Sequence, residues 1–192
     1  DVLILHGNSV TCGDNYEDFA RRPRDRMGRI LGAYQLCLDA GLNASVVAEC
    51  YLDQWLDKVR VIVVPELTSF EGDTDAQLRR FAENGGKVIF IGPIPKSGGK
   101  PIEWPGVRVE SKPWQDHIYL PAWPGMDKLP ILVRGDFHRV KLAGARNILN
   151  VIPAYDAKHG ACYGWGIGPA CEKASSHAAL TMRKVGRGEA WH

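Results

Sequence analysis

Four short apolar runs in the first half of the chain predict buried β-strands. They occupy residues 2–5, 45–48, 59–64 and 88–91. The third run is almost wholly valine and isoleucine and is followed by Pro65. Near-continuous apolar character of this kind is typical of a strand that is covered on both faces of a parallel sheet.

Two stretches between these runs have the spacing of amphipathic helices. In the first, which begins near residue 24, apolar side chains recur every three or four positions, and Gly41 suits the C-cap position. These apolar residues are Met27, Ile30, Leu31, Tyr34 and Leu38. The second stretch begins at Asp73 or Thr74, buries a stripe that includes Leu78 and Phe81, and ends at Gly85. Alternation of strand and helix over residues 1–92 predicts an α/β fold with an open parallel sheet and right-handed crossovers.

The second half of the chain has a different character. Residues 93–130 hold eight of the twelve prolines and three of the six tryptophans, and we expect an irregular segment there. Residues 131–192 contain short strand patterns, so we expect a β-rich extension of antiparallel strands or a hairpin within one domain of residues 1–192. The predicted strands are 130–134, 137–142, 148–152, 161–165, 178–183 and 189–192. Gly135-Asp136 between two apolar runs suits a hairpin turn.

Composition excludes few classes of function. The net charge of +2 comes from 24 basic and 22 acidic residues spread along the chain, so we expect no nucleic-acid partner. The arginine-rich run at residues 21–26 suits either a solvated helix start or an anionic partner. No apolar run reaches the ~20 residues of a membrane-spanning helix, so we expect no membrane partner. The sequence starts without methionine inside a strand pattern, and we expect a module of a longer polypeptide.

Most catalytic and cofactor motifs are missing. No G-x-G-x-x-G, P-loop, H-E-x-x-H, C-x-x-C or G-x-S-x-G pattern occurs, so we expect no cofactor, no metal and no catalytic residue. Cys12 is an alternative as a lone reactive thiol, and Cys162 and Cys171 are candidates for one disulfide.

One candidate ligand site lies where the parallel strands end. His6, Asn8 and Glu66 follow two of the apolar runs, and the carboxyl ends of parallel strands are where open α/β sheets bind ligands. The simpler interpretation is that Glu66 is a loop residue or a helix cap. The aromatic residues of the 93–130 segment either stack on sugar rings or form a small cluster of their own; they are Trp104, Trp114, Tyr119 and Trp123.

Three parts of the chain together resemble a known family. They are residues 27–47, residues 61–89 with their Asn84-Gly85-Gly86 turn, and the ending at residues 182–190 with Gly186-Arg187-Gly188. They are similar to the class I glutamine amidotransferase-like domain of multidomain glycoside hydrolases, of the β-galactosidase trimerisation type. In amidotransferases the turn after the fourth run carries a nucleophilic cysteine, and a His-x-Glu pair follows late in the chain. Here the turn is Ile91-Gly92-Pro93-Ile94, and no histidine has glutamate two positions later.

The resemblance implies a flavodoxin-like domain that follows a catalytic barrel in its parent enzyme. It implies a non-catalytic role in structure, in oligomer contacts or at the rim of an active site, with the barrel, sister subunits and carbohydrate as partners. It also favours a secreted or periplasmic location. The alternative is a small free-standing hydrolase or sugar-binding module that uses the pocket near His6, Asn8 and Glu66.

Overall fold

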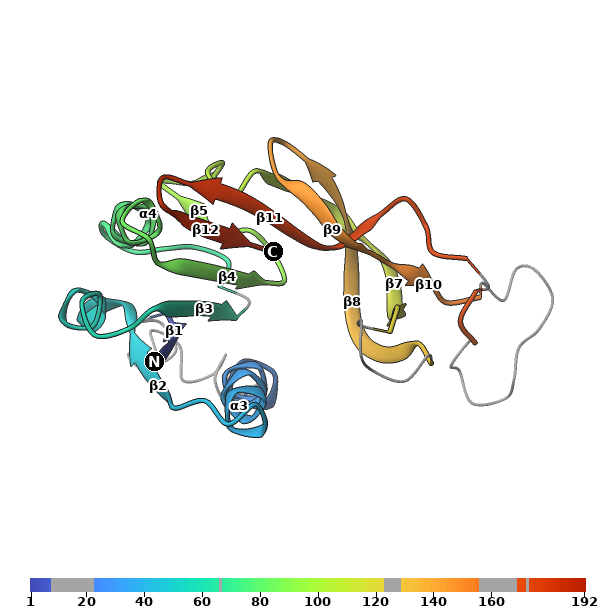
Figure 1. The fold of residues 1–192 in the computed structure, drawn as a ribbon, viewed down its shortest axis with the longest axis horizontal. Coiled ribbons are helices and arrows are strands. Elements are labelled where there is room, and N and C mark those ends of the chain that lie inside the picture. Colours follow the sequence, from blue (N-terminus) through green and yellow to red (C-terminus); the bar gives the residue numbers. More distant parts are fainter. Residues whose placement is uncertain (8–22, 66, 123–128, 156–168, 172) are drawn as a thin grey trace. The chain divides into compact units, whose positions relative to one another are not determined.

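The computed structural model describes residues 1–7, 23–65, 67–122, 129–155, 169–171 and 173–192 (Figure 1). The fold is mixed α/β. The chain forms two compact units. The first unit is Asp1–Pro105 with Arg183–His192, and the second is Gly106–Met182. The expected single domain, with its internal divisions at residues 92 and 130, stays a prediction.

Five strands of the first unit run parallel, in the order β2-β1-β3-β4-β12. They are β1 (Val2–His6), β2 (Ala44–Ala48), β3 (Val61–Pro65), β4 (Lys87–Ile91) and β12 (Gly188–Trp191). The hydrogen-bonded order continues to β11 (Ala178–Val185) and β9 (Arg146–Asn150), which pair antiparallel, so the seven-stranded sheet is mostly parallel. The prediction of an α/β fold with a parallel sheet and further antiparallel strands is confirmed.

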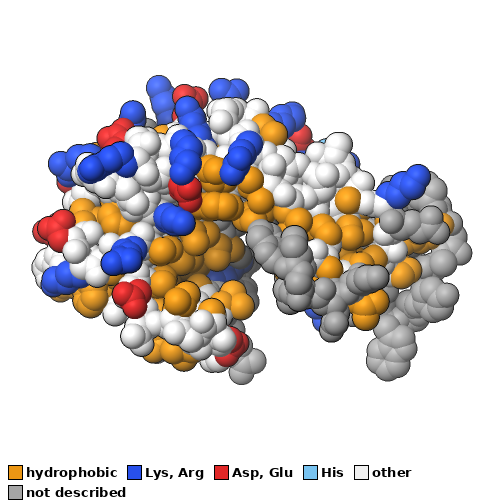
Figure 2. Space-filling model, in the orientation of Figure 1, with side chains coloured by type: hydrophobic (Ala, Val, Ile, Leu, Met, Phe, Trp, Pro, Cys, Tyr) orange, Lys and Arg blue, Asp and Glu red, His pale blue; other side chains and the backbone are white. Residues whose placement is uncertain are grey.

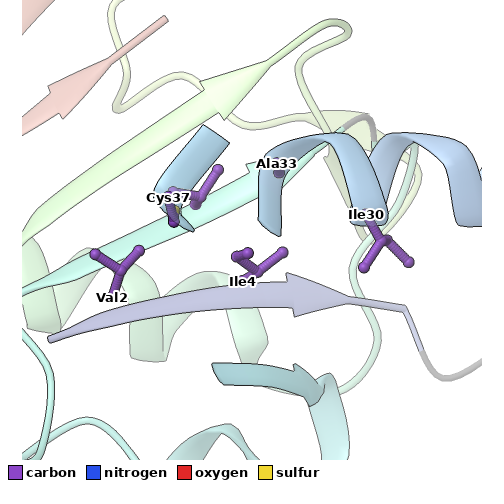
Figure 3. Packing of buried hydrophobic residues seen from close by; sticks show 6 residues of the cluster. Val2, Ile4, Ile30, Ala33 and Cys37 are labelled. Atoms are coloured by element: carbon purple, nitrogen blue, oxygen red, sulfur yellow. The ribbon is translucent and has the colours of Figure 1, made fainter. Parts of the chain in front are cut away.

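Helix α3 (Pro23–Asp39) packs on one face of this sheet. Its buried residues Ile30, Ala33 and Cys37 contact Val2 and Ile4 of β1 (Figure 3). The helix ends as the sequence predicts, because Gly41 takes a left-handed φ of 69° and the Leu42 N–H donates to the Cys37 carbonyl over 2.8 Å. Leu31 and Leu38 share the apolar spacing of the buried residues but remain 57% and 46% exposed.

The other face of the sheet is covered by η1 (Glu49–Gln54), a 3₁₀ helix, and by α4 (Thr74–Glu83). Side chains alternate between the faces of a strand, so Leu3 and Leu5 point away from α3. Both are fully buried, as are Leu52 of η1 and Leu78 of α4. Helical segments therefore cover both faces of the central strands.

The turn between β11 and β12 packs against the end of α4. The Arg187 N–H donates to the Glu83 carbonyl over 3.0 Å, and the Glu189 N–H donates to the Gly86 carbonyl over 3.1 Å. A Cβ on Gly188 would lie 2.1 Å from the Gly86 oxygen and 2.3 Å from the Ala82 oxygen. The two glycine-bearing turns that support the family resemblance are thus in direct contact, and only a residue without a side chain fits between them.

The second unit is built on a long antiparallel pair, β7 (Val107–Leu120) and β8 (Ile131–Leu142), with β10 (Ile152–Pro153) beside β7. The prediction of an irregular segment is wrong for residues 107–120. The predicted hairpin at Gly135-Asp136 is also wrong, because both residues lie inside β8. Gly135, with a φ of 148°, stands at a shift in the β7–β8 register, which is a β-bulge. The expected strand at 161–165 lies outside the described residues.

Gly188 gives the sharpest stability test of the first unit. We expect Gly188→Ala to lower the free energy of unfolding by about 2–3 kcal/mol, because the new methyl group meets backbone carbonyls that cannot rotate away. The matched control is Gly28→Ala in α3, where a Cβ meets nothing within 4 Å. Alanine should be neutral or stabilise there by about 0.5–1 kcal/mol, since glycine weakens a helix. Urea unfolding of both variants measures the difference, and equal effects would contradict the contact described above.

A partly buried carboxylate, that of Glu189, connects β12 to its neighbours. The Glu189 carboxylate accepts hydrogen bonds from Lys184 Nζ over 2.6 Å and from Trp191 Nε1 over 3.0 Å, and Lys87 Nζ lies 3.5 Å from it. The hydrogen bond from Lys184 is the main cause that lowers the pKa of Glu189 from 4.5 to about 2, against the opposing effect of burial. The charged carboxylate is therefore the form that the fold stabilises.

This carboxylate should make stability depend on pH. Because its pKa is lower in the folded than in the unfolded chain, its contribution is complete above about pH 4.5 and is lost as the pH falls towards 2. We expect the free energy of unfolding of Glu189→Gln to be about 1–2 kcal/mol lower than that of wild type at pH 7. This difference in stability should disappear near pH 2–3. Thermal unfolding of both proteins across this range measures it. A gap that stays constant with pH would show that the charge of Glu189 contributes nothing.

Candidate functional site

The candidate site is the edge of the sheet where β1, β3 and β4 end. The registers Ile4↔Val63 and Pro65↔Ile91 bring the ends of these three strands level, so His6, Pro65 and Ile91 lie in one row. Of the predicted ligand-binding residues, the structure describes His6, whereas Asn8 and Glu66 lie outside the described residues. Ligand binding by His6, Asn8 and Glu66 therefore stays a prediction.

His6 is half-buried at the last position of β1. Its Nδ1 lies 3.1 Å from the carbonyl oxygen of Gly7. A carbonyl can only accept, so this contact requires the proton on Nδ1 and makes Nε2 of the neutral ring a hydrogen-bond acceptor. Alternation along β1 places His6 on the face of the sheet that α3 covers.

His192 is a second histidine at this edge, which the sequence did not reveal. Its Nε2 donates to the carbonyl of Gly92 over 2.7 Å, across one hundred positions of the chain. Burial lowers the pKa of His192, and the hydrogen bond to Gly92 opposes that shift. In the strand order β1-β3-β4-β12, His6 is on the first strand and His192 comes directly after the last, so β3 and β4 lie between the two histidines. The two rings therefore do not form an acid–base pair.

The turn after β4 has the backbone of a sharp elbow but no nucleophile. Gly92 takes a φ of 87°, a left-handed conformation that strains any residue with a side chain. Ile91 before it is 41% exposed, and Pro93 follows it. Acyl transfer needs a nucleophile beside a base, and this turn supplies none.

The described aromatic residues of the 93–130 segment pack against the protein itself. Trp104 Nε1 donates to Asp75 Oδ1 over 2.7 Å, and its ring meets Phe90 edge to face at 5.3 Å. In the second unit Trp114 is contacted by the His177 ring and by the Arg139 guanidinium, each 5.0 Å from its centre. These contacts favour a structural role for both tryptophans over sugar stacking; Trp123 lies outside the described residues.

The described residues contain neither a cluster of metal ligands nor a membrane-spanning helix. Among the described residues, no three His, Cys, Asp or Glu side chains gather closely enough to hold a metal ion. No described helix has the length and apolar character needed to cross a membrane. Cys162 lies outside the described residues, so its pairing with Cys171 stays a prediction.

No protein-family model and no curated protein sequence matches this chain. Solved structures do match it. Gan42B, a GH42 β-galactosidase from G. stearothermophilus, matches with a TM-score of 0.64 at 14% identity, over 99% of this chain and 26% of that chain. An α-L-fucosidase from Paenibacillus thiaminolyticus matches with a TM-score of 0.63 at 16% identity, over 99% and 28%. An exo-β-1,4-mannosidase from an Opitutaceae bacterium matches with a TM-score of 0.62 at 15% identity, over 100% and 30%.

The chain thus spans about a quarter to a third of the length of these structures. At such low identity the likeness concerns the fold alone. In its fold, the chain resembles a domain of glycoside hydrolases.

Proposed function

We propose that this chain is a non-catalytic accessory domain of a glycoside hydrolase, of the class I amidotransferase-like type known as the β-galactosidase trimerisation domain. One observation carries the proposal: the fold matches over 99–100% of this chain but only 26–30% of each glycoside hydrolase structure. A unit of this relative size accompanies the catalytic part of those longer chains.

The diversity of the matched enzymes supports a non-catalytic role. They include a β-galactosidase, an α-L-fucosidase and an exo-β-1,4-mannosidase, which differ in sugar and in anomeric bond. Glycoside hydrolysis depends on carboxylates positioned around one particular bond. A fold shared by enzymes of such different specificity is better suited to structure or assembly than to choosing the substrate.

Strand order supports the flavodoxin-like part of the proposal. Flavodoxin-like sheets have the parallel order 2-1-3-4-5. The parallel strands of the first unit follow β2-β1-β3-β4-β12, with β12 in the fifth place. The missing nucleophile at Gly92 and the missing His-x-Glu pair agree with an amidotransferase-like domain that has lost its chemistry.

An exposed apolar surface on α3 and β2 supports protein partners. Leu31 and Leu38 are seven residues apart and so share one side of α3, and Val46 of β2 lies on the sheet face that α3 covers. Leu31, Leu38 and Val46 are 57%, 46% and 43% exposed. Leu42, in the connection between α3 and β2, is 44% exposed. Apolar surface of this kind marks contacts with other proteins or domains. We assign this surface to the catalytic part of the same polypeptide or to a sister subunit.

The purified chain should have no catalytic activity of its own. We expect no turnover of nitrophenyl β-galactoside, α-fucoside or β-mannoside, and no release of ammonia from glutamine. The full-length polypeptide serves as the positive control for the glycosides. Turnover by the chain alone that saturates with substrate and follows the protein through a second purification would refute the proposal.

The apolar surface predicts a difference between the full-length polypeptide and the chain alone. The double variant Leu31→Glu with Leu38→Glu should lower the unfolding temperature of the full-length protein by about 5 °C or more, because it places two charges in a buried contact. The same variant should change the chain alone by less than about 2 °C, since both positions are exposed there. Leu36→Glu is the matched control on another side of α3, where the leucine is 67% exposed. Equal shifts in both proteins would mean that nothing covers this surface.

A further inference from the structure

Strand β2 forms one edge of the seven-stranded sheet, and its outer side is open. The Val2 N–H donates to the Asn43 carbonyl over 3.1 Å, so the odd-numbered residues of β2 direct their backbone groups towards β1. The N–H and the carbonyl of Val46 therefore face outwards, as do the N–H of Ala48 and the carbonyl of Ala44. Among the described residues, no strand pairs with β2 on this side.

The sequence of β2 does nothing to hinder pairing with a further strand. Natural edge strands usually carry charges, a proline or a bulge that discourages such pairing. Strand β8, an edge of the three-stranded sheet, carries Arg134, Arg139 and Lys141 and the bulge at Gly135. Strand β2 is ASVVA, with neither charge nor proline, and its register with β1 is unbroken. Of these two edges, β2 is the one suited to accept a partner strand.

The side of α3 next to β2 is apolar. The helix packs on the sheet through Ile30, Ala33 and Cys37. Connections between parallel strands are right-handed, and an α-helix that leads from β1 to β2 with these three residues inwards turns Leu31 and Leu38 towards the β2 edge. The apolar surface described above therefore borders the open strand.

The apolar area at this edge suits a weak contact. In Figure 2, lysine and arginine side chains are most numerous in the upper part of the first unit, whereas hydrophobic side chains reach the surface at its lower margin, where Figure 1 places α3. Tyr51 of η1, close to the end of β2, is 56% exposed and adds to this area. Covering Tyr51 and the apolar surface removes on the order of 500 Å² from each partner, against about 800 Å² in a standard interface.

We propose that β2 pairs antiparallel with β2 of a second copy of this chain, about a two-fold axis at Val46. A two-fold contact brings the same surface of both copies together, and the outward groups of β2 fit this symmetry. Val46 exchanges both backbone hydrogen bonds with Val46 of the second copy, and the Ala48 N–H donates to the carbonyl of Ala44 across the pair.

The same symmetry brings the two apolar surfaces together. The pairing joins the two sheets into one, and it turns Leu31 and Leu38 of each α3 towards the other helix over the joined strands. It also places the end of β2 that follows Leu42 beside the end that precedes Tyr51 in the second copy. An unrelated extended peptide would satisfy the backbone of β2 but would bring no apolar surface to meet α3.

This inference rests on the proposed function, because it assigns the apolar surface to a sister subunit. For so small a contact we expect a Kd on the order of 0.1 mM. The chain alone is therefore monomeric at the micromolar concentrations of thermal unfolding. A longer polypeptide that holds two copies close together raises their effective concentration and so favours the pair.

Sedimentation equilibrium of the chain between about 0.01 and 1 mM tests the proposal. We expect wild type to form dimers, and Val46→Glu and Val46→Lys each to weaken association about fivefold or more, because like charges then meet across the axis. An equimolar mixture of the two variants should return to within about threefold of wild type, since glutamate then faces lysine. Leu36→Glu is the matched control on another side of α3, where the leucine is 67% exposed, and it should leave association unchanged.

A chain that stays monomeric at about 1 mM would overturn the proposal, and so would charge variants that associate as wild type does. Variants that weaken association but do not recover on mixing would rule out the axis at Val46. Because Val46 is 43% exposed, both variants should fold, and their unfolding temperatures verify this. If Leu31→Glu with Leu38→Glu destabilises the full-length protein while the chain does not associate with itself, the surface contacts the catalytic part. The proposed function then stands and only this inference fails.

Discussion

The first unit depends on the contact between two glycine-bearing turns. Gly85 and Gly86 end α4, and Gly186 and Gly188 connect β11 to β12. Because Gly188 has no side chain, the backbone of β12 reaches the carbonyls of Ala82 and Gly86, and the Glu189 N–H completes the contact. This approach brings a strand from the end of the chain into the parallel sheet beside β4. Without it, the ion pairs and hydrogen bonds of Glu189 would have no fixed partners.

The contact between the two turns involves both edges of the sheet, because β12 runs to the carboxyl edge and α4 ends at the amino edge. At the carboxyl edge, β12 carries His192 to the carbonyl of Gly92, in the turn that follows β4. At the amino edge, the end of α4 and the start of β4 form part of a groove that Arg60, Arg80 and Asp57 also line. An open α/β sheet usually binds ligands at the first edge. In the described part of this edge, the turn at Gly92 carries no nucleophile.

Much of the first unit could be predicted from the sequence, because its signals are local. A run such as residues 61–64 can be satisfied only by burial on both sides. The apolar spacing of residues 27–38 predicts the helix but not all of its buried face, since Leu31 and Leu38 are exposed and Ala33 and Cys37 are buried. The second unit was harder. Pro113 cannot donate a hydrogen bond to the ladder, and the β7–β8 register shifts on both sides of it, so a 14-residue strand resembles an irregular segment in sequence. Gly135-Asp136 has the composition of a hairpin turn, and a bulge uses the same residues.

The positions of His192 and of the groove residues, unlike those of the strands, are determined by contacts between distant parts of the chain. His192 could not be found from sequence, because its place follows from a pairing between β12 and β4 that joins residues one hundred positions apart. Arg60, Arg80 and Asp57 look like ordinary solvated charges when each is seen in its own segment, and only the fold places them around one apolar floor. Both sets of residues therefore depend on contacts between distant parts of the chain, which no local pattern in the sequence records.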